Sequence, residues 1–414
     1  MTAAVASLPP AIHASFQALK IQPAKARRIF DTPYEPNLKW WTTNQEEYVK
    51  PSNDPLPKGF PEQIVSKSVW DGKVLINQPE KWLYVFSEED VELVNKAYDH
   101  FQSLNITNNE IDQMTFPVPE DSSLYKALKG IPYELNHGLG LRVLRGLPVD
   151  EWTRSKQISV FAGISAYVSP RRIANNGNNI VHLRWLSKVR PTVTKVSRME
   201  VGYMTDAKGH NSLLVFHNDG SLGIISLFTL GVAETGGLSQ LASVGQTYNY
   251  FAENRRDILR ELAKGDWKNR YQPTGTCQHC RPLIHPVGND QVISVYSRRP
   301  YFGFYGADED VEPLPKEKHL ALDAIHFTAE KFSLDLDLQK GDLEYVNNVT
   351  VYHARTSSED SEKNQRHLIR LWLDNEEQTL PEILVDEFRK PREGQGWPLE
   401  AWDSLDEVVH GTKQ

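Results

Sequence analysis

Apolar and polar positions along the chain follow two different periods, and the period changes near residue 212. Before that point apolar residues recur mainly at helical spacing, between short apolar runs. This part predicts strands over 82–86 and 138–144 and helices over 88–104, 124–134 and 152–167. After it, short apolar or alternating runs are separated by Gly, Asp and Glu, which is typical of strands. The strands predicted there cover residues 212–216, 224–233, 238–242, 343–347, 349–353 and 366–373.

A long insertion separates the two blocks of strands. Its pattern predicts a helix that begins near Ser243, a hairpin around Gly288-Asn289-Asp290 and a second helix over 316–332. Helices in front, followed by two blocks of strands, predict an α+β, mainly β, fold. We expect an antiparallel β core with flanking helices.

This reading divides the chain into three parts. Residues 1–135 form an N-terminal arm and a helical and strand extension that packs on the core. Its first 61 residues are rich in Pro and polar groups, and we expect an irregular arm anchored by Trp40 and Trp41. Residues 136–380 form the β domain, with the helical insertion at about 243–335, and residues 381–414 form a C-terminal extension.

Composition and charge narrow the range of partners. The hydrophobic share of 39% and the aromatic share of 10% indicate a globular protein with a sizeable core. The formal net charge is −8, and the absence of a Lys/Arg-rich block argues against nucleic acid as a partner. No stretch approaches the roughly 20 apolar residues of a membrane span, and the first ten residues do not resemble a secretory signal. We expect a cytoplasmic protein with a small-molecule substrate, and the sequence leaves a homo-oligomer open.

The two cysteines lie close together, in Cys277-Gln278-His279-Cys280. A structural zinc site needs four ligands, and a second ligand pair is missing here. Two reduced thiols in a loop are therefore favoured over half of a zinc site.

His217-Asn218-Asp219 is the first candidate for chemistry. Residues two apart in a strand project to the same side, so His217 and Asp219 could hold one ion. A second histidine would complete a 2-His-1-carboxylate triad, which leaves metal positions open for a bidentate cosubstrate and O₂. The triplet alone is a weak indication, because a loop histidine beside the turn-forming pair Asp219-Gly220 gives the same letters.

The second candidate lies in the last two predicted strands. One strand ends in His353, and thirteen residues later Arg366 and Arg370 share one face of the next strand. Two arginines in an apolar strand are costly to bury unless an anion meets them, and the carboxylate of a cosubstrate could do so. The alternative is that both arginines pair with core acids such as Asp374 or Glu344.

Taken together, these segments resemble the taurine dioxygenase/TfdA superfamily of Fe(II)/2-oxoglutarate dioxygenases, which includes clavaminate synthase and γ-butyrobetaine hydroxylase. The resemblance covers about 138–373. Within this range, Tyr296-Ser297-Arg298-Arg299 resembles a strand typical of fungal members. The other matching motifs are Phe216-His217-Asn218-Asp219, Gly236-Gly237-Leu238-Ser239, Asn347-Asn348, His353-Ala354-Arg355 and Arg366-His367-Leu368-Ile369-Arg370.

The resemblance implies a double-stranded β-helix, or jelly roll, and a role for each matching residue. His217, Asp219 and His353 would be the Fe(II) ligands. Arg366 and Ser239 would hold the far carboxylate of 2-oxoglutarate, with Ser239 in place of the threonine common in relatives. The spacing between His353 and Arg366 is slightly longer than in taurine dioxygenase, which leaves Arg370 open as the alternative. Otherwise Arg370, together with Arg298, would contact the substrate.

The chemistry implied by the resemblance is O₂- and 2-oxoglutarate-dependent oxidation of an unactivated C–H bond. Hydroxylation, desaturation and oxidative cyclisation all use such a site, whereas halogenation is disfavoured because Asp219 is present. The fungal likeness suggests a tailoring step of secondary metabolism on an anionic or amino-acid-derived metabolite. Sulfonate scavenging, a cupin-type metalloenzyme without 2-oxoglutarate and a non-enzymatic binding protein remain as alternatives.

Overall fold

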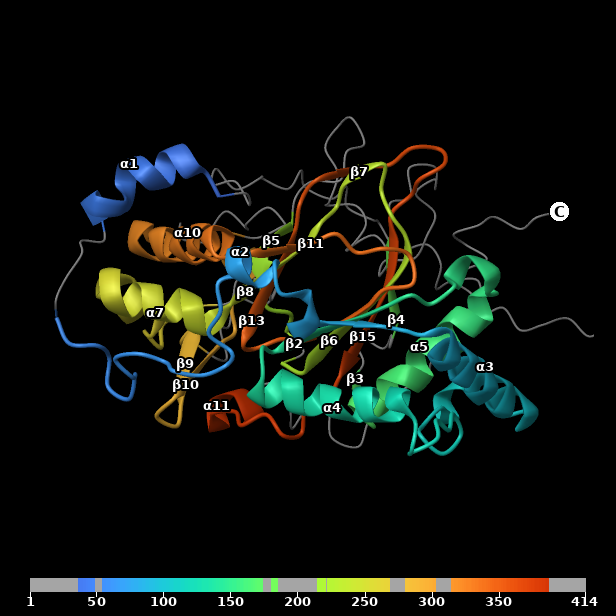
Figure 1. Cartoon of the computed structure of the whole chain (residues 1–414). Helices are drawn as coiled ribbons and strands as arrows, with labels where there is room; N and C mark the ends of the chain where they lie inside the picture. The colour runs from blue at the N-terminus through green and yellow to red at the C-terminus, as the bar shows by residue number, and fades with distance from the viewer. Residues whose placement is uncertain are drawn as a thin grey trace, which may run out of the picture.

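The fold consists of two β-sheets with helices on both outer faces, in a computed structural model that describes residues 36–48, 54–173, 180–184, 214–220, 222–268, 280–302 and 314–386 (Figure 1). The seven-stranded large sheet has the order β1 (Leu83–Val85), β2 (Leu141–Arg145), β12 (Leu343–Asn347), β6 (Ile224–Gly231), β15 (His367–Leu373) and β3 (Arg172–Ile173), and β4 (Ile180–Arg184) also pairs with β15. The four-stranded small sheet has the order β11 (Leu334–Leu336), β8 (Ser239–Ser243), β13 (Val351–Arg355) and β5 (Leu214–His217).

The two sheets share an apolar core on their inner faces. Leu141 and Val143 of β2, Leu241 of β8, Val351 of β13 and Leu368 of β15 belong to one buried cluster. Alternate residues of these strands point to the other face of their sheet, as the period of two requires. Leu343, Tyr345, Ile369 and Leu371 point outward in this way, under the helices, so Glu344 and Arg370 between them lie on the inner face.

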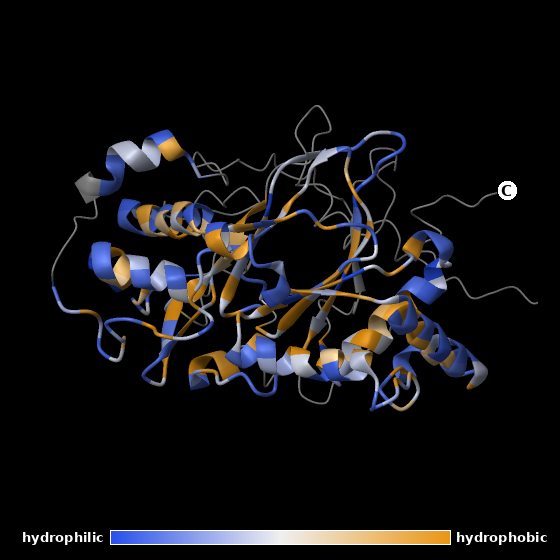
Figure 2. Ribbon diagram, in the orientation of Figure 1, coloured by the Kyte–Doolittle hydropathy of each residue, from blue (hydrophilic) through white to orange (hydrophobic). Residues whose placement is uncertain are grey.

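Three helices cover the outer face of the large sheet: α3 (Glu88–Ser103), α4 (Ser123–His137) and α5 (Arg154–Val168). Ser87 caps α3, since its hydroxyl accepts from the amide of Asp90 and the Asp90 carboxylate accepts from the amide of Ser87. The largest apolar cluster joins these helices to β6, β12 and β15. Figure 2 shows apolar residues concentrated on the strands and on helix faces toward them.

The insertion between β8 and β11 covers the outer face of the small sheet. Its helices are α7 (Val244–Asn254), α8 (Arg256–Leu262), α9 (Arg299–Phe302) and α10 (Lys316–Lys331), and the predicted hairpin forms as β9 (Ile284–Val287) and β10 (Gln291–Ser294). The helix predicted from Ser243 forms as α7, and Arg255, which leaves helical geometry and binds Asp257 at 2.9 Å, separates it from α8. The short elements of the described structure include α2 (Gly72–Leu75), α11 (Glu382–Leu384), β7 (Thr235–Gly236) and β14 (Ser358–Glu359).

The prediction of an irregular N-terminal arm is wrong over α1 (Leu38–Tyr48). The side chain of Asn37 accepts from the amide of Trp40 at 2.9 Å and begins the helix. Trp40 stacks on His319 of α10 with ring centroids 4.0 Å apart, and Trp41 stacks on Phe327 at 6.2 Å. Both tryptophans are therefore the anchors that the sequence indicated.

The remaining strand predictions agree with the structure within a few residues. The strand predicted at 349–353 begins two residues later, because residues 347–350 form a turn in which the amide of Thr350 donates to the carbonyl of Asn347. The α+β architecture with flanking helices is confirmed. No helix among the described residues is long and apolar enough to cross a membrane. The domain boundaries at 135 and 380 stay a prediction.

Candidate active site

His217 and His353 meet because their strands are neighbours. β5 and β13 pair antiparallel in a register that puts these two residues directly opposite each other. Their ring centroids are 4.1 Å apart. Together with Asp219 they form a cluster in which one ligand atom from each residue lies within 4.8 Å of the others. The structure thus brings the three predicted ligands to one point.

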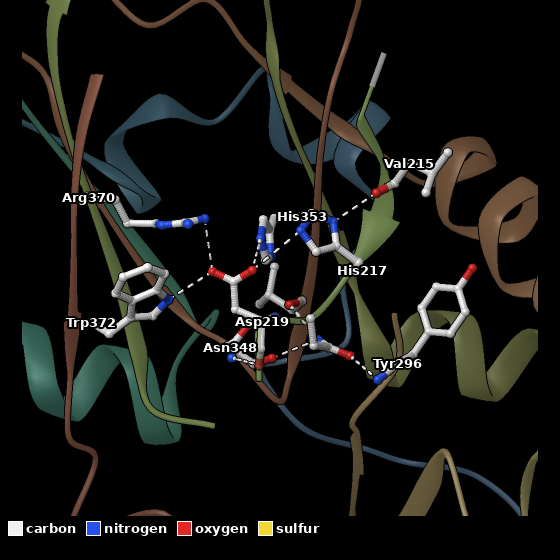
Figure 3. A network of polar contacts seen from close by, with 10 residues as sticks. Val215, His217, Asp219, Tyr296, Asn348, His353, Arg370 and Trp372 are labelled. Atoms are coloured by element: carbon white, nitrogen blue, oxygen red, sulfur yellow. Dashed lines mark hydrogen bonds and ion pairs between the residues drawn. The ribbon is translucent and has the colours of Figure 1, made fainter. Parts of the chain in front are cut away.

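Asp219 lies just beyond the end of β5, and the predicted Asn pair holds it there. The amide of Asp219 donates to the Asn348 side chain at 2.8 Å, and the Asn348 side chain donates back to the carbonyl of Asp219 at 2.7 Å. Asn218 is buried and donates to the carbonyls of Asn348 and Val351. These bonds fix the backbone on both sides of the turn, so the carboxylate of Asp219 faces the two imidazoles (Figure 3).

The donor atoms fit a divalent metal ion. Nδ1 of His217 lies 2.8 Å from the carbonyl of Val215, which directs Nε2 toward the other ligands. Both ring nitrogens of His353 are buried and have no hydrogen-bond partner among the described residues. Burial and the neighbouring His217 lower the pKa of His353 to about 4, so its imidazole is neutral at pH 7 and can donate a lone pair to a metal.

The two oxygens of Asp219 have different surroundings. Oδ1 lies 3.5 Å from Nε2 of His217 and 3.7 Å from Nε2 of His353. Oδ2 accepts from Nε1 of Trp372 at 2.9 Å and pairs with Nη1 of Arg370 at 3.1 Å. Burial alone would raise the pKa of Asp219, but Arg370 and the two histidines outweigh it and hold the pKa well below the usual range. Asp219 is therefore ionised and has one oxygen, Oδ1, facing the metal position.

Sequence reasoning missed Trp372. Trp372 and Arg370 lie two residues apart on β15, so both side chains face the interior, and the guanidinium carbon of Arg370 lies 4.1 Å from the centroid of the Trp372 ring. An aromatic residue in an apolar strand reads as core. Only the three-dimensional structure, in which Trp372 lies beside Asp219, shows that its N–H orients a metal ligand.

We predict that Trp372→Phe weakens Fe(II) affinity by about 10-fold, because loss of a partner that orients a ligand typically costs 10- to 100-fold. Anaerobic Fe(II) titration measures this effect. The matched control is Trp152→Phe, which replaces a half-buried tryptophan packed against the helical side of the core. Equal Fe(II) affinity in wild type and Trp372→Phe would contradict the role.

Arg366 and Ser239 lie together at a second polar cluster inside the molecule. Ser239 donates to Glu344 at 3.2 Å, and Glu344 in turn interacts electrostatically with Arg366. Gly237 has a φ of +77°, and a Cβ there would lie 3.1 Å from Cδ of Arg366, so the Gly-Gly turn leaves room for this arginine. Burial and the neighbouring Arg355 lower the pKa of Arg366 to about 9, which leaves it cationic at neutral pH.

Arg298 does not join either cluster in the contacts that the structure describes. The strand predicted around it ends at Ser294, and α9 begins at Arg299. Nη1 of Arg298 lies 2.5 Å from Oδ1 of Asp323 on α10, and both side chains are fully buried. A buried carboxylate needs a counter-charge, which accounts for the arginine. The contact of Arg298 with the substrate stays a prediction.

We expect Arg298→Met to lower the free energy of unfolding by about 3–5 kcal/mol, because Asp323 would stay buried without its partner. The double variant Arg298→Met/Asp323→Leu should recover most of the loss. Urea unfolding of both variants measures it. If Arg298→Met instead raised the KM for a substrate and left stability unchanged, the structural role would be wrong.

The cysteine motif lies mostly outside the described residues. Cys277 is not among them, and Cys280 is half-buried. The prediction of two reduced thiols stays a prediction.

A model of the family described as taurine catabolism dioxygenase TauD, TfdA family matches residues 102–372. The chain belongs to the TauD/TfdA family. Taurine hydroxylase-like protein SAT17 of Stachybotrys chartarum is 30% identical over 75% of this chain and 79% of its own length. FR-33289 synthase of Streptomyces rubellomurinus is 25% identical over 76% of this chain and 91% of its own length.

Solved structures of similar fold include iron oxygenases with bound products or cosubstrate. Asparagine oxygenase in complex with Fe(II), hydroxyasparagine and succinate has a TM-score of 0.51 and 16% identity, over 70% of this chain and 93% of the other. The non-haem iron oxygenase OrfP in complex with Fe and alpha-ketoglutaric acid has a TM-score of 0.50 and 13% identity, over 71% and 94%. These likenesses confirm the jelly-roll core.

This TauD/TfdA member is a non-haem iron oxygenase that depends on 2-oxoglutarate, with Fe(II), 2-oxoglutarate and O₂ as its cofactor and cosubstrates. The alternatives of a cupin-type metalloenzyme without 2-oxoglutarate and of a non-enzymatic protein are thereby set aside. The family match and the clustering of the three ligand side chains in the structure agree with each other.

Proposed function

We propose that this oxygenase oxidises an unactivated C–H bond of a small anionic metabolite, most simply an amino-acid derivative, in a tailoring step of secondary metabolism. The observation that carries the proposal is the cationic Arg370 beside the metal ligands, 3.1 Å from Asp219. A guanidinium offers five N–H donors in a plane, a shape that suits carboxylates and sulfonates. A substrate anion near Arg370 would lie next to the metal position.

We assign the other roles on the same geometry. His217, Asp219 and His353 would hold Fe(II), and Arg366 with Ser239 would bind the far carboxylate of 2-oxoglutarate. The bound iron and 2-oxoglutarate activate O₂ for attack on a C–H bond. For hydroxylation, substrate, O₂ and 2-oxoglutarate give the alcohol, succinate and CO₂, so the cosubstrate supplies the two electrons that O₂ reduction needs beyond those from the C–H bond.

The names of similar proteins support an amino-acid-derived substrate. Structures of similar fold contain hydroxyasparagine, in asparagine oxygenase, and L-Arg derivatives, in OrfP. FR-33289 synthase is a biosynthetic enzyme by name. The runner-up is sulfonate scavenging, which the name of the taurine hydroxylase-like relative favours.

A substrate panel tests both proposals. Succinate release is measured with amino acids, their neutral amides and sulfonates such as taurine. We expect release with one of the carboxylic acids, at a kcat/KM at least about 10-fold above that of its amide, because a site built to bind a polar group rejects the analogue without it. Equal rates for acid and amide would contradict the anionic proposal. Sulfite release from taurine would establish the runner-up instead.

A further inference from the structure

Glu344 is a carboxylate inside the barrel, next to the residues assigned to the cosubstrate. It lies on β12, between Val143 of β2 and Leu227 of β6, and is 1% exposed. Neighbouring residues Leu343 and Tyr345 belong to the apolar cluster under the helices, so Glu344 points to the opposite, inner face. The position brings an acid to the place where another carboxylate should bind.

The two oxygens of Glu344 are not equally satisfied. Oε1 accepts from the hydroxyl of Ser239 at 3.2 Å. Oε2 is buried and has no hydrogen-bond partner among the described residues. A buried polar atom in this state is costly unless a ligand completes it. Oε2 therefore marks a missing partner within the cluster that holds Ser239 and Arg366.

Charged groups around Glu344 come from several elements. Arg366 precedes β15, and Arg355 pairs with Ser239 across β13 and β8 and interacts with Arg366. Asp342 also acts on Glu344, although Arg145 binds Asp342 at 2.6 Å. Asp360 acts on Arg366 and accepts from its amide at 2.9 Å. Across the large sheet the direct neighbours Val143 and Leu227 are apolar.

An incoming carboxylate meets Glu344 in one of two forms. An ionised Glu344 would repel it and would compete with it for Arg366. A protonated Glu344 would leave the guanidinium to the ligand and would also donate a hydrogen bond from Oε2. Only the second form gives Oε2 a hydrogen-bond partner without repelling the incoming carboxylate.

We propose that Glu344 is a further contact for the far carboxylate of 2-oxoglutarate and that cosubstrate binding takes up one proton at Oε2. This inference rests on the proposed assignment of Arg366 and Ser239 to that carboxylate. The proton moves from solvent to Glu344, and no covalent bond of the cosubstrate changes. Affinity for 2-oxoglutarate then depends on pH in a range where the cosubstrate itself does not titrate.

The sign of the effect follows from the state of Glu344 before binding. Burial raises the pKa of Glu344 to about 7, against the opposing effects of Ser239 and Arg366. A bound carboxylate raises this pKa further, so binding is tightest below pH 7 and weakens as the pH rises through it. Between pH 6.5 and 8.5 the dissociation constant should increase about 20-fold for one coupled proton.

Calorimetry of 2-oxoglutarate binding to the Mn(II)-loaded protein tests the proposal without turnover. Titrations at pH 7.5 in three buffers that differ in heat of ionisation give the number of protons taken up. We expect about 0.7 proton for wild type, since most Glu344 is ionised at that pH before binding. Glu344→Gln should bind with no uptake and with a dissociation constant that is constant from pH 6.5 to 8.5.

Two controls isolate the residue and the ligand group. Glu330→Gln replaces a carboxylate near the end of α10 whose pKa is also raised by partial burial, and it should behave as wild type. The ligand 2-oxobutanoate keeps the metal-binding keto acid but lacks the far carboxylate, and its binding should take up no proton.

The outcomes separate this inference from the proposed function. If wild type binds 2-oxoglutarate without proton uptake, or if Glu344→Gln retains the uptake, the role of Glu344 is wrong and the assignment of Arg366 stands. If wild type binds no 2-oxoglutarate at any pH, both fail. The buffer series on wild type decides the question even if Glu344→Gln does not fold.

Discussion

His353→Ala should abolish stable Fe(II) binding and lower substrate-dependent succinate production by at least about 100-fold, the upper end of what loss of a mere orienting partner costs. His353 is a buried imidazole, held neutral at pH 7, and neither of its nitrogens has a hydrogen bond among the described residues. Its removal leaves only His217 and Asp219, which is too few ligands for a tight iron site. Anaerobic Fe(II) titration and succinate assays measure the two effects.

The matched control for this variant is His285→Ala. His285 is also buried, also has a pKa lowered to about 4 by burial, and contacts the carbonyl of Pro282 in the insertion. This control should keep iron and activity, although it loses a similar volume. If His353→Ala retained Fe(II) binding and turnover, this result would contradict the assignment of the metal centre.

The sequence could predict the ligands because several local patterns, each weak alone, together resemble the motifs of one family. His217 and Asp219 are two residues apart at the end of a strand, and His353 ends a strand with the Asn pair before it. Period-two patterns located those strands within a few residues. That β5 and β13 are neighbours, with His217 opposite His353, is a non-local fact that periodicity does not contain. The resemblance to the family supplied it.

Partners of the arginines could not be read from strand patterns. Arg370 pairs with Asp219, a residue about 150 positions earlier in the chain, and Trp372 joins it only through the tertiary register. The sequence predicts a strand at Arg298, whereas in the structure this residue precedes a short helix and pairs with Asp323. An arginine that balances a core acid and an arginine that awaits a ligand have the same local sequence pattern.

Glu344 belongs to the alternative interpretation of Arg366 and Arg370, in which both arginines pair with core acids. In that interpretation Glu344 is a core acid that pairs with Arg366 or Arg370, so that no ligand is needed. In the structure Glu344 does interact with Arg366, yet one of its oxygens stays unsatisfied. A single Glu between apolar residues does not indicate that it is buried at the centre of a sheet. The proposed role of Glu344 depends on that burial.

Arg366→Met should raise the dissociation constant for 2-oxoglutarate by about 100-fold or more, because a buried charge-assisted contact to a carboxylate is lost. Arg366 is 8% exposed and cationic at neutral pH, Gly237 adjoins it, and Glu344, with which it interacts, accepts from Ser239. Calorimetry on the Mn(II)-loaded protein measures the change. Mn(II) affinity should stay the same, since Arg366 does not contact the metal ligands in the described structure.

Arg370→Met is the matched comparison, and it settles which arginine holds the cosubstrate. Arg370 contacts Asp219, so its loss should weaken metal affinity and substrate binding more than 2-oxoglutarate binding. The two variants remove the same charge four residues apart, at a position just before β15 and at a position within it. A larger loss of 2-oxoglutarate affinity in Arg370→Met than in Arg366→Met would exchange the two roles, because the arginine that binds the far carboxylate must dominate that dissociation constant.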